Sequence, residues 1–250
     1  MTLYTAIGKY EFRADPFHCD CTGKLFMGHL GNHMLNAADF HANDRDFGIR
    51  YLQTINKAWV LSRLAIEMER MPEIYERFYV ESWIESSMRF FTNRSFRVVG
   101  MDGQVYGYGK SIWAMIDTET RQPCNLLDIK DGELAKWELK EELNPIGKLT
   151  RVMMSNEAEL AKSMETGYHD VDINGHINSV KYIEHAMDLW ETDWHCEHRL
   201  KRVDVAYVAE GHRGDRLNLY REQTGEMEFC IRICRENGDE LCRTKMVFEK

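Results

Sequence analysis

The segment from Asp172 to Asn178 carries the residues best suited to chemistry in this chain of 250 residues. Asp172, Asn174, His176 and Asn178 place a carboxylate, two amides and an imidazole at alternate positions, just before apolar residues at helical spacing. A helix N-terminus offers unpaired backbone N–H groups and a partial positive charge. Both stabilise negative charge on an oxygen atom, so the segment predicts a site that favours a tetrahedral intermediate.

A purely structural interpretation of these residues is the alternative. Asn174-Gly175 suits a tight turn, and either Asp172 or Asn174 suits a helix cap. Capping accounts for one or two of the side chains, whereas the segment has four polar groups that include a histidine. We therefore favour the catalytic interpretation.

The elements that must position these residues occur twice along the chain. Gly28-His29 and Gly175-His176 each begin a helical pattern of apolar residues, and the pairs are 147 positions apart (175 minus 28). Asp102-Gly103 and Asn237-Gly238 suit tight hairpin turns. Segments rich in β-branched and aromatic residues predict strands at 78–84, 95–99 and 110–116 in the first half and 203–208, 216–220, 227–233 and 242–248 in the second.

Each half is therefore predicted to be a helix followed by an antiparallel meander that wraps it, which makes the fold class α+β. One half alone leaves a sheet face or edge uncovered, and a second half covers it. We expect an N-terminal half at residues 1–132, a linker or surface helix at 133–150 and a C-terminal half at 151–250.

Composition and charge argue against several classes of protein. An apolar fraction of 44% and a charged fraction of 29% are typical of soluble globular domains. The net charge of −9 disfavours nucleic-acid binding, and no apolar run is long enough to span a bilayer. The first residues lack the features of a secretion signal, so we expect a cytoplasmic protein.

The seven cysteines are predicted to be free thiols in a reducing compartment. His18-Cys19-Asp20-Cys21 and His195-Cys196-Glu197-His198 each contain side chains that bind metals. Neither segment has a second pair of ligands at the spacing of a zinc finger. We therefore expect no metal and no cofactor.

The chemistry-bearing segment also resembles a known family. Asp172-x-Asn174-x-His176 followed by Ile-Asn-Ser-Val-Lys-Tyr-Ile is similar to the signature of plant and bacterial acyl-acyl-carrier-protein thioesterases. Further similar segments follow in the family's order at residues 59–63, 70–72, 111–115 and 207–215. The resemblance implies a tandem (double) hot-dog fold, with a long helix wrapped by an antiparallel β-sheet in each half. It also implies hydrolysis of fatty acyl-[acyl carrier protein] thioesters to free fatty acid, which terminates fatty acid synthesis.

By the same resemblance, Asp172, Asn174, His176 and Glu210 form the catalytic set, with water as the nucleophile. We expect Glu210 to activate the water and His176 to share proton transfer or position that water. Asn174 is expected to orient the water or polarise the carbonyl, and Asp172 to hold the network in place. Many relatives carry a cysteine directly after the glutamate, where this chain has Gly211, so direct hydrolysis is favoured over a covalent cysteine mechanism.

Only the second half is expected to be catalytic. Aligning the two Gly-His pairs keeps the histidine but removes the acid and the amide: Leu25 stands opposite Asp172, Met27 opposite Asn174 and His29 opposite His176. The first half is therefore expected to form the wall of an acyl-chain pocket. The candidate pocket residues are Met27, Met34, Trp59, Trp83 and Trp113.

Docking of a carrier protein requires a local basic surface, because the net charge of the chain is negative. The candidate docking residues are Lys181, Arg199, Lys201, Arg202, Arg213 and Arg216. The alternative is that these residues belong to an ordinary solvated surface. The alternative functions are an acyl-coenzyme A thioesterase and a non-catalytic acyl-binding hot-dog protein. The preferred chain length and the assembly, a homodimer included, are left open.

Overall fold

The computed structural model describes residues 4–149, 151–155 and 157–250. Residues 1–3 and 150, which the predicted first half and linker include, and residue 156 of the predicted second half lie outside the described residues. The α-helices are α1 Met27–Asn43, α2 Ile49–Thr54, α3 Lys181–Met187 and α4 Thr192–Glu197. Short 3₁₀ helices are η1 Pro16–His18, η2 Leu126–Asp128, η3 Lys130–Trp137 and η4 Tyr168–Asp170. The strands are β1 Gly8–Arg13, β2 Lys57–Met68, β3 Arg77–Ser87, β4 Phe91–Gly100, β5 Val105–Asp117, β6 Glu159–Glu165, β7 Arg199–Tyr207, β8 Arg216–Gly225, β9 Glu228–Arg235 and β10 Glu240–Glu249.

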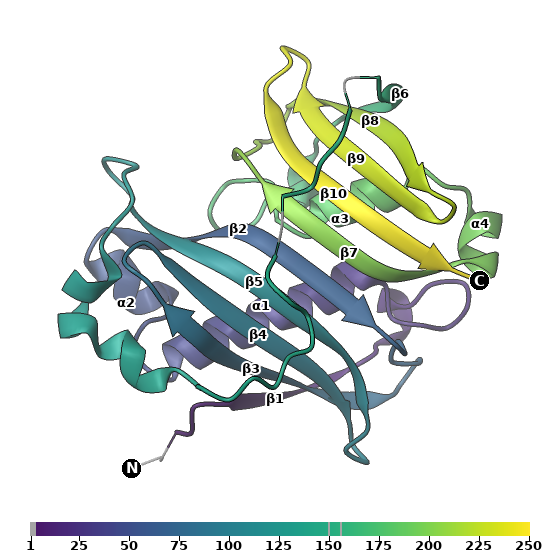
Figure 1. Ribbon diagram of the computed structural model, residues 1–250. Helices are drawn as coiled ribbons and strands as arrows, with labels where there is room; N and C mark the ends of the chain where they lie inside the picture. Colours follow the sequence, from purple (N-terminus) through teal and green to yellow (C-terminus); the bar gives the residue numbers. More distant parts are fainter. Residues whose placement is uncertain (1–3, 150, 156) are drawn as a thin grey trace.

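The strands of the described residues form one antiparallel sheet in the order β1-β3-β4-β5-β2-β7-β10-β9-β8-β6. Counted from its outer edge, the N-terminal part has the order 1-3-4-5-2 and the C-terminal part the order 6-8-9-10-7, so the same topology occurs twice. The two parts meet where β2 pairs with β7, and α1 and α3 lie on the same side of the sheet (Figure 1). The predicted α+β fold class is confirmed. No helix in the described residues is long and apolar enough to cross a membrane.

Helix α1 is the long helix around which the N-terminal strands wrap. Leu30, Met34, Ala37 and Ala38 recur at spacings of one turn, and each is at most 5% exposed. They share one hydrophobic core with alternate residues of the surrounding strands, which point to the same face of a sheet. The apolar spacing that predicts this helix is confirmed.

The second helix begins later than its apolar spacing predicts. Helix α3 starts at Lys181, not at Gly175, and contains seven residues. Gly175 has a φ of +79°, outside the helical region, and the Asn178 side chain accepts a hydrogen bond from Val180 N at 3.2 Å. The prediction of a helix N-terminus at the chemistry-bearing segment is therefore wrong, because local turns hold the chain out of the helix there.

The segment predicted as a linker packs against the sheet. After η3, the chain crosses the face of the N-terminal strands opposite α1 (Figure 1). Asn144, which is 5% exposed, donates hydrogen bonds to Ser95 Oγ at 2.9 Å and to Gly109 O at 2.7 Å, and accepts one from Ile146 N at 2.9 Å. Lys110 Nζ donates to Ile146 O at 3.1 Å. One buried amide therefore ties the segment to two strands.

We predict that Asn144→Ala lowers the free energy of unfolding by about 1–3 kcal/mol, because the substitution leaves buried acceptors without a donor. Urea unfolding followed by circular dichroism measures the change. Gln104→Ala, which truncates an exposed amide, is the control and should change the free energy by less than about 0.5 kcal/mol. Equal stability of the two variants would contradict the proposed tether.

Candidate active site

Residues 171–177 form a hydrogen-bonded loop that carries three of the predicted catalytic residues. Its ends pair as an isolated antiparallel bridge. Asp172 N donates to His176 O at 2.9 Å, and Gly175 N donates to Asp172 O at 3.0 Å. The Asp172 carboxylate accepts a hydrogen bond from Asn174 N at 2.8 Å. Asp172 therefore shapes the loop with both its backbone and its side chain.

His176 faces Glu210, which follows strand β7. The distance from His176 Nε2 to Glu210 Oε2 is 3.4 Å, and the two side chains are 28% and 32% exposed, so water can reach both. Arg121, in the turn after β5, places Nη2 2.5 Å from the same carboxylate oxygen. The ring of His212 packs edge-on against His176 with centroids 5.1 Å apart. One carboxylate thus contacts an imidazole and a guanidinium that come from different parts of the chain.

The turn that carries Glu210 is held by a second ion pair. Asp215 accepts hydrogen bonds from His212 N at 2.8 Å and from Arg235 Nε at 2.9 Å, and Arg235 Nη2 donates to the carbonyl of Glu210. Burial raises the pKa of Asp215, but the His212 N–H and the Arg235 guanidinium outweigh burial and leave this pKa below its usual range. The ionised Asp215 therefore fixes the backbone of the turn.

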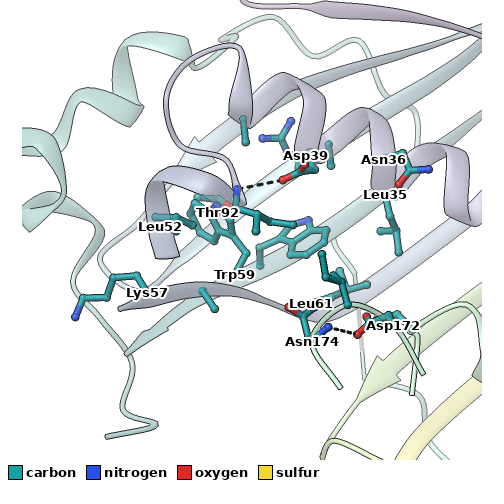
Figure 2. A pocket seen from close by; sticks show the side chains of 18 of the residues that line it. Leu35, Asn36, Asp39, Leu52, Lys57, Trp59, Leu61, Thr92, Asp172 and Asn174 are labelled. Atoms are coloured by element: carbon teal, nitrogen blue, oxygen red, sulfur yellow. Dashed lines mark hydrogen bonds between the residues drawn. The ribbon is translucent and has the colours of Figure 1, made fainter. Parts of the chain in front are cut away.

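A cavity of about 460 Å³ extends from the loop into the N-terminal part. Asp172 and Asn174 reach it from the C-terminal part, whereas Asp39 and Trp59 reach it from α1 and β2 (Figure 2). His176 and Glu210 are not in its lining. The structure thus brings the four predicted catalytic residues together as two pairs, Asp172 with Asn174 and His176 with Glu210, and no side-chain hydrogen bond among the described residues joins the pairs.

The five predicted pocket residues divide among three places. Trp59 and Trp113 line the cavity beside Asp172, and Met27 lines a different cavity. Met34 is fully buried in the core. Trp83 is also fully buried, but it pairs with Ser95, whose side chain faces the segment around Asn144. Of the five predicted residues, only Trp59 and Trp113 therefore line the cavity beside Asp172. Trp83 faces the opposite side of the sheet, because alternate residues of a strand face opposite sides.

The cavity also contains a polar group that sequence analysis missed. Arg94 of β4, which is 6% exposed, lines it together with Asp39, Asn36 and Thr92. Its guanidinium donates to Ser82 Oγ at 3.0 Å, and within the described ranges no carboxylate lies at ion-pair distance. Burial lowers the pKa of Arg94 to about 10 and raises the pKa of Asp39. Sequence spacing could have revealed Arg94, because it lies two residues before Phe96 in a predicted strand region and residues two apart on a strand face the same side.

The six basic residues predicted to dock a carrier protein do not form one unpaired patch. Five have carboxylate partners, whereas Arg213 is exposed and, in the part of the chain that the structure describes, has none at ion-pair distance. Arg213 lies three residues after Glu210. The observed pairs are Lys181–Glu184, Arg199–Glu249, Lys201–Glu69, Lys201–Glu249, Arg202–Glu67, Arg202–Asp204 and Arg216–Glu236.

Hydrogen bonds identify the counterpart of the loop at residues 171–177 in the N-terminal part. Asp20 N donates to Lys24 O at 2.8 Å, Gly23 N donates to Asp20 O at 3.0 Å, and the Asp20 carboxylate accepts from Thr22 N at 2.8 Å. These are the bonds that shape residues 172–176. The two loops are 152 positions apart (172 minus 20), whereas the Gly-His pairs predict 147.

The predicted alignment of the halves is therefore wrong by five positions. The Gly-His pairs share letters but not structure, because Gly28 lies inside α1 whereas Gly175 lies in a turn. Two further bonds, Leu25 N to Pro72 O at 2.9 Å and Ile177 N to Gly211 O at 2.8 Å, also correspond. The corrected counterparts are Asp20 for Asp172, Thr22 for Asn174, Lys24 for His176 and Met71 for Glu210. The N-terminal loop keeps the aspartate and lacks the amide, the imidazole and the second carboxylate.

Two family models match the chain: the acyl-ACP thioesterase N-terminal domain over residues 8–130 and the acyl-ACP thioesterase C-terminal domain over residues 153–250. Among solved structures, an acyl-ACP thioesterase from Bacteroides thetaiotaomicron is 43% identical with a TM-score of 0.91, and the match covers 98% of both chains. The 12:0-ACP thioesterase from Umbellularia californica is 20% identical with a TM-score of 0.84 over 100% of this chain and 99% of that chain, which shows a shared fold.

Curated plant relatives match over a smaller share of their length. The chloroplastic palmitoyl-acyl carrier protein thioesterase of Gossypium hirsutum is 24% identical over 159 residues, which cover 62% of this chain and 38% of the relative. The corresponding protein of Arabidopsis thaliana is 22% identical over 174 residues, which cover 68% and 42%. The chain thus matches about two fifths of each of these relatives.

The space beside Gly211, the position at which the sequence disfavours a cysteine nucleophile, generates a prediction. A Cβ atom there would lie 2.5 Å from Ile177 Cδ1 and 2.6 Å from Tyr182 Oη. We predict that Gly211→Ala and Gly211→Cys each lower the free energy of unfolding by about 1–3 kcal/mol, because both add the crowded Cβ. Urea unfolding of both variants measures this. A loss confined to the cysteine variant, or no loss in either, would show that crowding is not the constraint.

Proposed function

The chain belongs to the acyl-ACP thioesterase family, which confirms the resemblance and its tandem hot-dog fold, and on that premise we propose that it hydrolyses fatty acyl-ACP thioesters to free fatty acid and carrier protein. The observation that carries this proposal is the contact between His176 and Glu210 at 3.4 Å, on a loop whose Asp172 and Asn174 line a cavity large enough for an acyl chain. An imidazole in contact with a carboxylate is suited to proton transfer at neutral pH.

The proposed reaction uses water as the nucleophile. Glu210 and His176 together accept a proton from the water as its oxygen attacks the thioester carbonyl carbon. The C–S bond of the tetrahedral intermediate then breaks, and the thiolate of the carrier's prosthetic group takes the proton from the same pair. The products are a carboxylic acid and a thiol, so the atoms of one water molecule are fully accounted for.

The remaining residues are assigned positioning roles. The Asn174 amide, at the edge of the cavity, is proposed to contact the thioester carbonyl, and Asp172 holds Asn174 through the 2.8 Å bond to its backbone N–H. Arg121 holds the Glu210 carboxylate from the N-terminal part. Trp59 and Trp113 form an apolar wall of the cavity, against which the acyl chain of the substrate is buried away from water.

The carrier protein is proposed to approach the face around Glu210. Arg121 is half exposed there, and exposed Arg213 has no carboxylate partner among the residues described. Arg121 already pairs with Glu210, so Arg213 is the charge proposed to meet an anionic carrier surface beside the site. The basic residues of β7 are excluded from this role because carboxylates of β2, β7 and β10 already pair with them.

We predict that His176→Ala and Asp172→Ala each lower the turnover of an acyl-ACP substrate by roughly 10²–10⁴, the range for groups that act in proton transfer or hold such groups in place. Steady-state assays of thiol release measure the effect, and thermal unfolding checks that the variants fold. His169→Ala, which removes an exposed histidine near the loop, is the matched control and should keep normal turnover. Near-normal hydrolysis in both test variants would refute the assignment.

The same assay with one acyl group on carrier protein and on coenzyme A tests the substrate class. We predict a higher kcat/KM for the carrier-protein substrate, because exposed Arg213 beside Glu210 offers a docking contact for an anionic protein. Arg213→Glu should raise KM for the carrier-protein substrate several-fold and leave KM for the coenzyme A substrate within about twofold. A strong preference for coenzyme A would contradict the proposed partner.

A further inference from the structure

A second cavity, of about 720 Å³, lies on the opposite side of the junction between the two parts. Its lining includes the loop Asp20–Lys24, the first turn of α1, the end of α3, helix α4 and the start of β7. None of the residues assigned to catalysis belongs to it. It also contains Met27, one of the three predicted pocket residues that the first cavity lacks.

This cavity is the repeat-related counterpart of the cavity beside Asp172. The 152-position offset of the two loops continues along the helices, so that residues of α1 in one cavity match residues of α3 in the other. Helices α2 and α4 match at an offset of 143 positions (192 minus 49), and strands β2 and β7 at 142 (199 minus 57). The matched lining residues are Asn32 and Glu184, Leu35 and Met187, Asn36 and Asp188, Ile49 and Thr192, Leu52 and His195, Gln53 and Cys196, Lys57 and Arg199, and Ala58 and Leu200.

The pairing of β2 with β7 supports the same relation independently. Arg63 pairs with Ala206 and Leu64 pairs with Val205. At the offset of 142, the counterpart of Arg63 is Val205 and the counterpart of Leu64 is Ala206, so the first pair maps onto the second. The two cavities are therefore equivalent sites about a pseudo-twofold relation that passes through the junction of the sheet.

The chemistry of the second site differs at the positions that matter for hydrolysis. Lys24 stands where the catalytic loop has His176, and Met71 stands where it has Glu210. Apolar Leu25, Met27 and Trp190 line the interior. Within the described ranges, no carboxylate lies at ion-pair distance from Lys24. The site thus combines apolar walls with Lys24 as a cation without a carboxylate at ion-pair distance in those ranges, and it lacks the counterparts of His176 and Glu210. Its lining also includes the carboxylates of Asp20, Glu184, Asp188 and Glu197 and the imidazoles of His29, His195 and His198.

We propose that this second cavity binds a free fatty acid, with the alkyl chain among the apolar side chains and the carboxylate at Lys24. The inference rests on the proposed function, because the occupant of the first cavity identifies the class of ligand for its counterpart. The negatively charged carboxylate of a fatty acid can pair with the Lys24 ammonium group. A thioester group is neutral and cannot form this ion pair. The site therefore binds a fatty acid, which is the product of the proposed reaction, and does not catalyse hydrolysis.

The number of fatty acid molecules bound per chain tests the proposal. Isothermal titration calorimetry uses a series of saturated fatty acids of graded chain length, below their micelle concentrations. A reductant is present because Cys21 and Cys196 line the cavity with Sγ atoms 3.0 Å apart. We expect two molecules per wild-type chain at saturation.

Matched variants assign each binding event to a cavity. Leu35→Trp fills the first cavity and Met187→Trp fills its counterpart, so each variant should bind one molecule. Lys24→Glu, which adds no bulk, should weaken only the second event, by roughly tenfold, the equivalent of about 1.4 kcal/mol. Thermal unfolding confirms that each variant is folded.

Binding of a single molecule by the wild type, or binding that is unaffected by both Met187→Trp and Lys24→Glu, overturns the proposal. Hydrolysis of acyl-ACP by the same wild-type preparation is measured in parallel. Absence of hydrolysis with two bound fatty acids would refute the proposed function and leave the second site standing. Normal hydrolysis with one bound fatty acid would support the proposed function and refute the second fatty-acid site.

Discussion

The antiparallel pairing of β2 with β7 is the interaction on which the rest of the structure depends. Five residue pairs join the strands, and Arg202 of β7 reaches Glu67 of β2 at 2.8 Å across the junction. Because this ladder fixes the two parts in register, the loop at Asp172 lies over the cavity of the N-terminal part and Arg121 reaches Glu210. Without the ladder, the cavity beside Asp172 and the His176–Glu210 pair would have no fixed relation.

The repeated topology places a loop of the same shape on each side of the junction, but only one of the two loops carries the histidine and the amide of the proposed site. Both loops have the same hydrogen bonds, and an aspartate occupies the same place in each. The fold therefore requires the aspartate at both positions, since its carboxylate closes the turn. The imidazole, the amide and the glutamate, to which the proposed reaction gives direct roles, are replaced in the N-terminal part by Lys24, Thr22 and Met71.

Local patterns predicted the features that depend on neighbouring residues. The strands and the stripe of α1 follow from spacing, and residues 172–176 stand out by their side-chain types. Features set by distant contacts were missed. The alignment of the halves depends on carbonyls of Pro72 and Gly211, far from the loops in sequence. The Arg121–Glu210 contact joins residues 89 positions apart (210 minus 121), and Trp83 faces away from the cavity because of strand register.

The most direct measurement of the central claim is a crystal structure with a hydrolysis-resistant acyl thioether analogue of the carrier-bound substrate. The account predicts the alkyl chain against Trp59 and Trp113, with the carbon adjacent to sulfur at the loop between Asn174 and the His176–Glu210 pair. An alkyl chain outside that cavity, or a sulfur remote from His176 and Glu210, would contradict it.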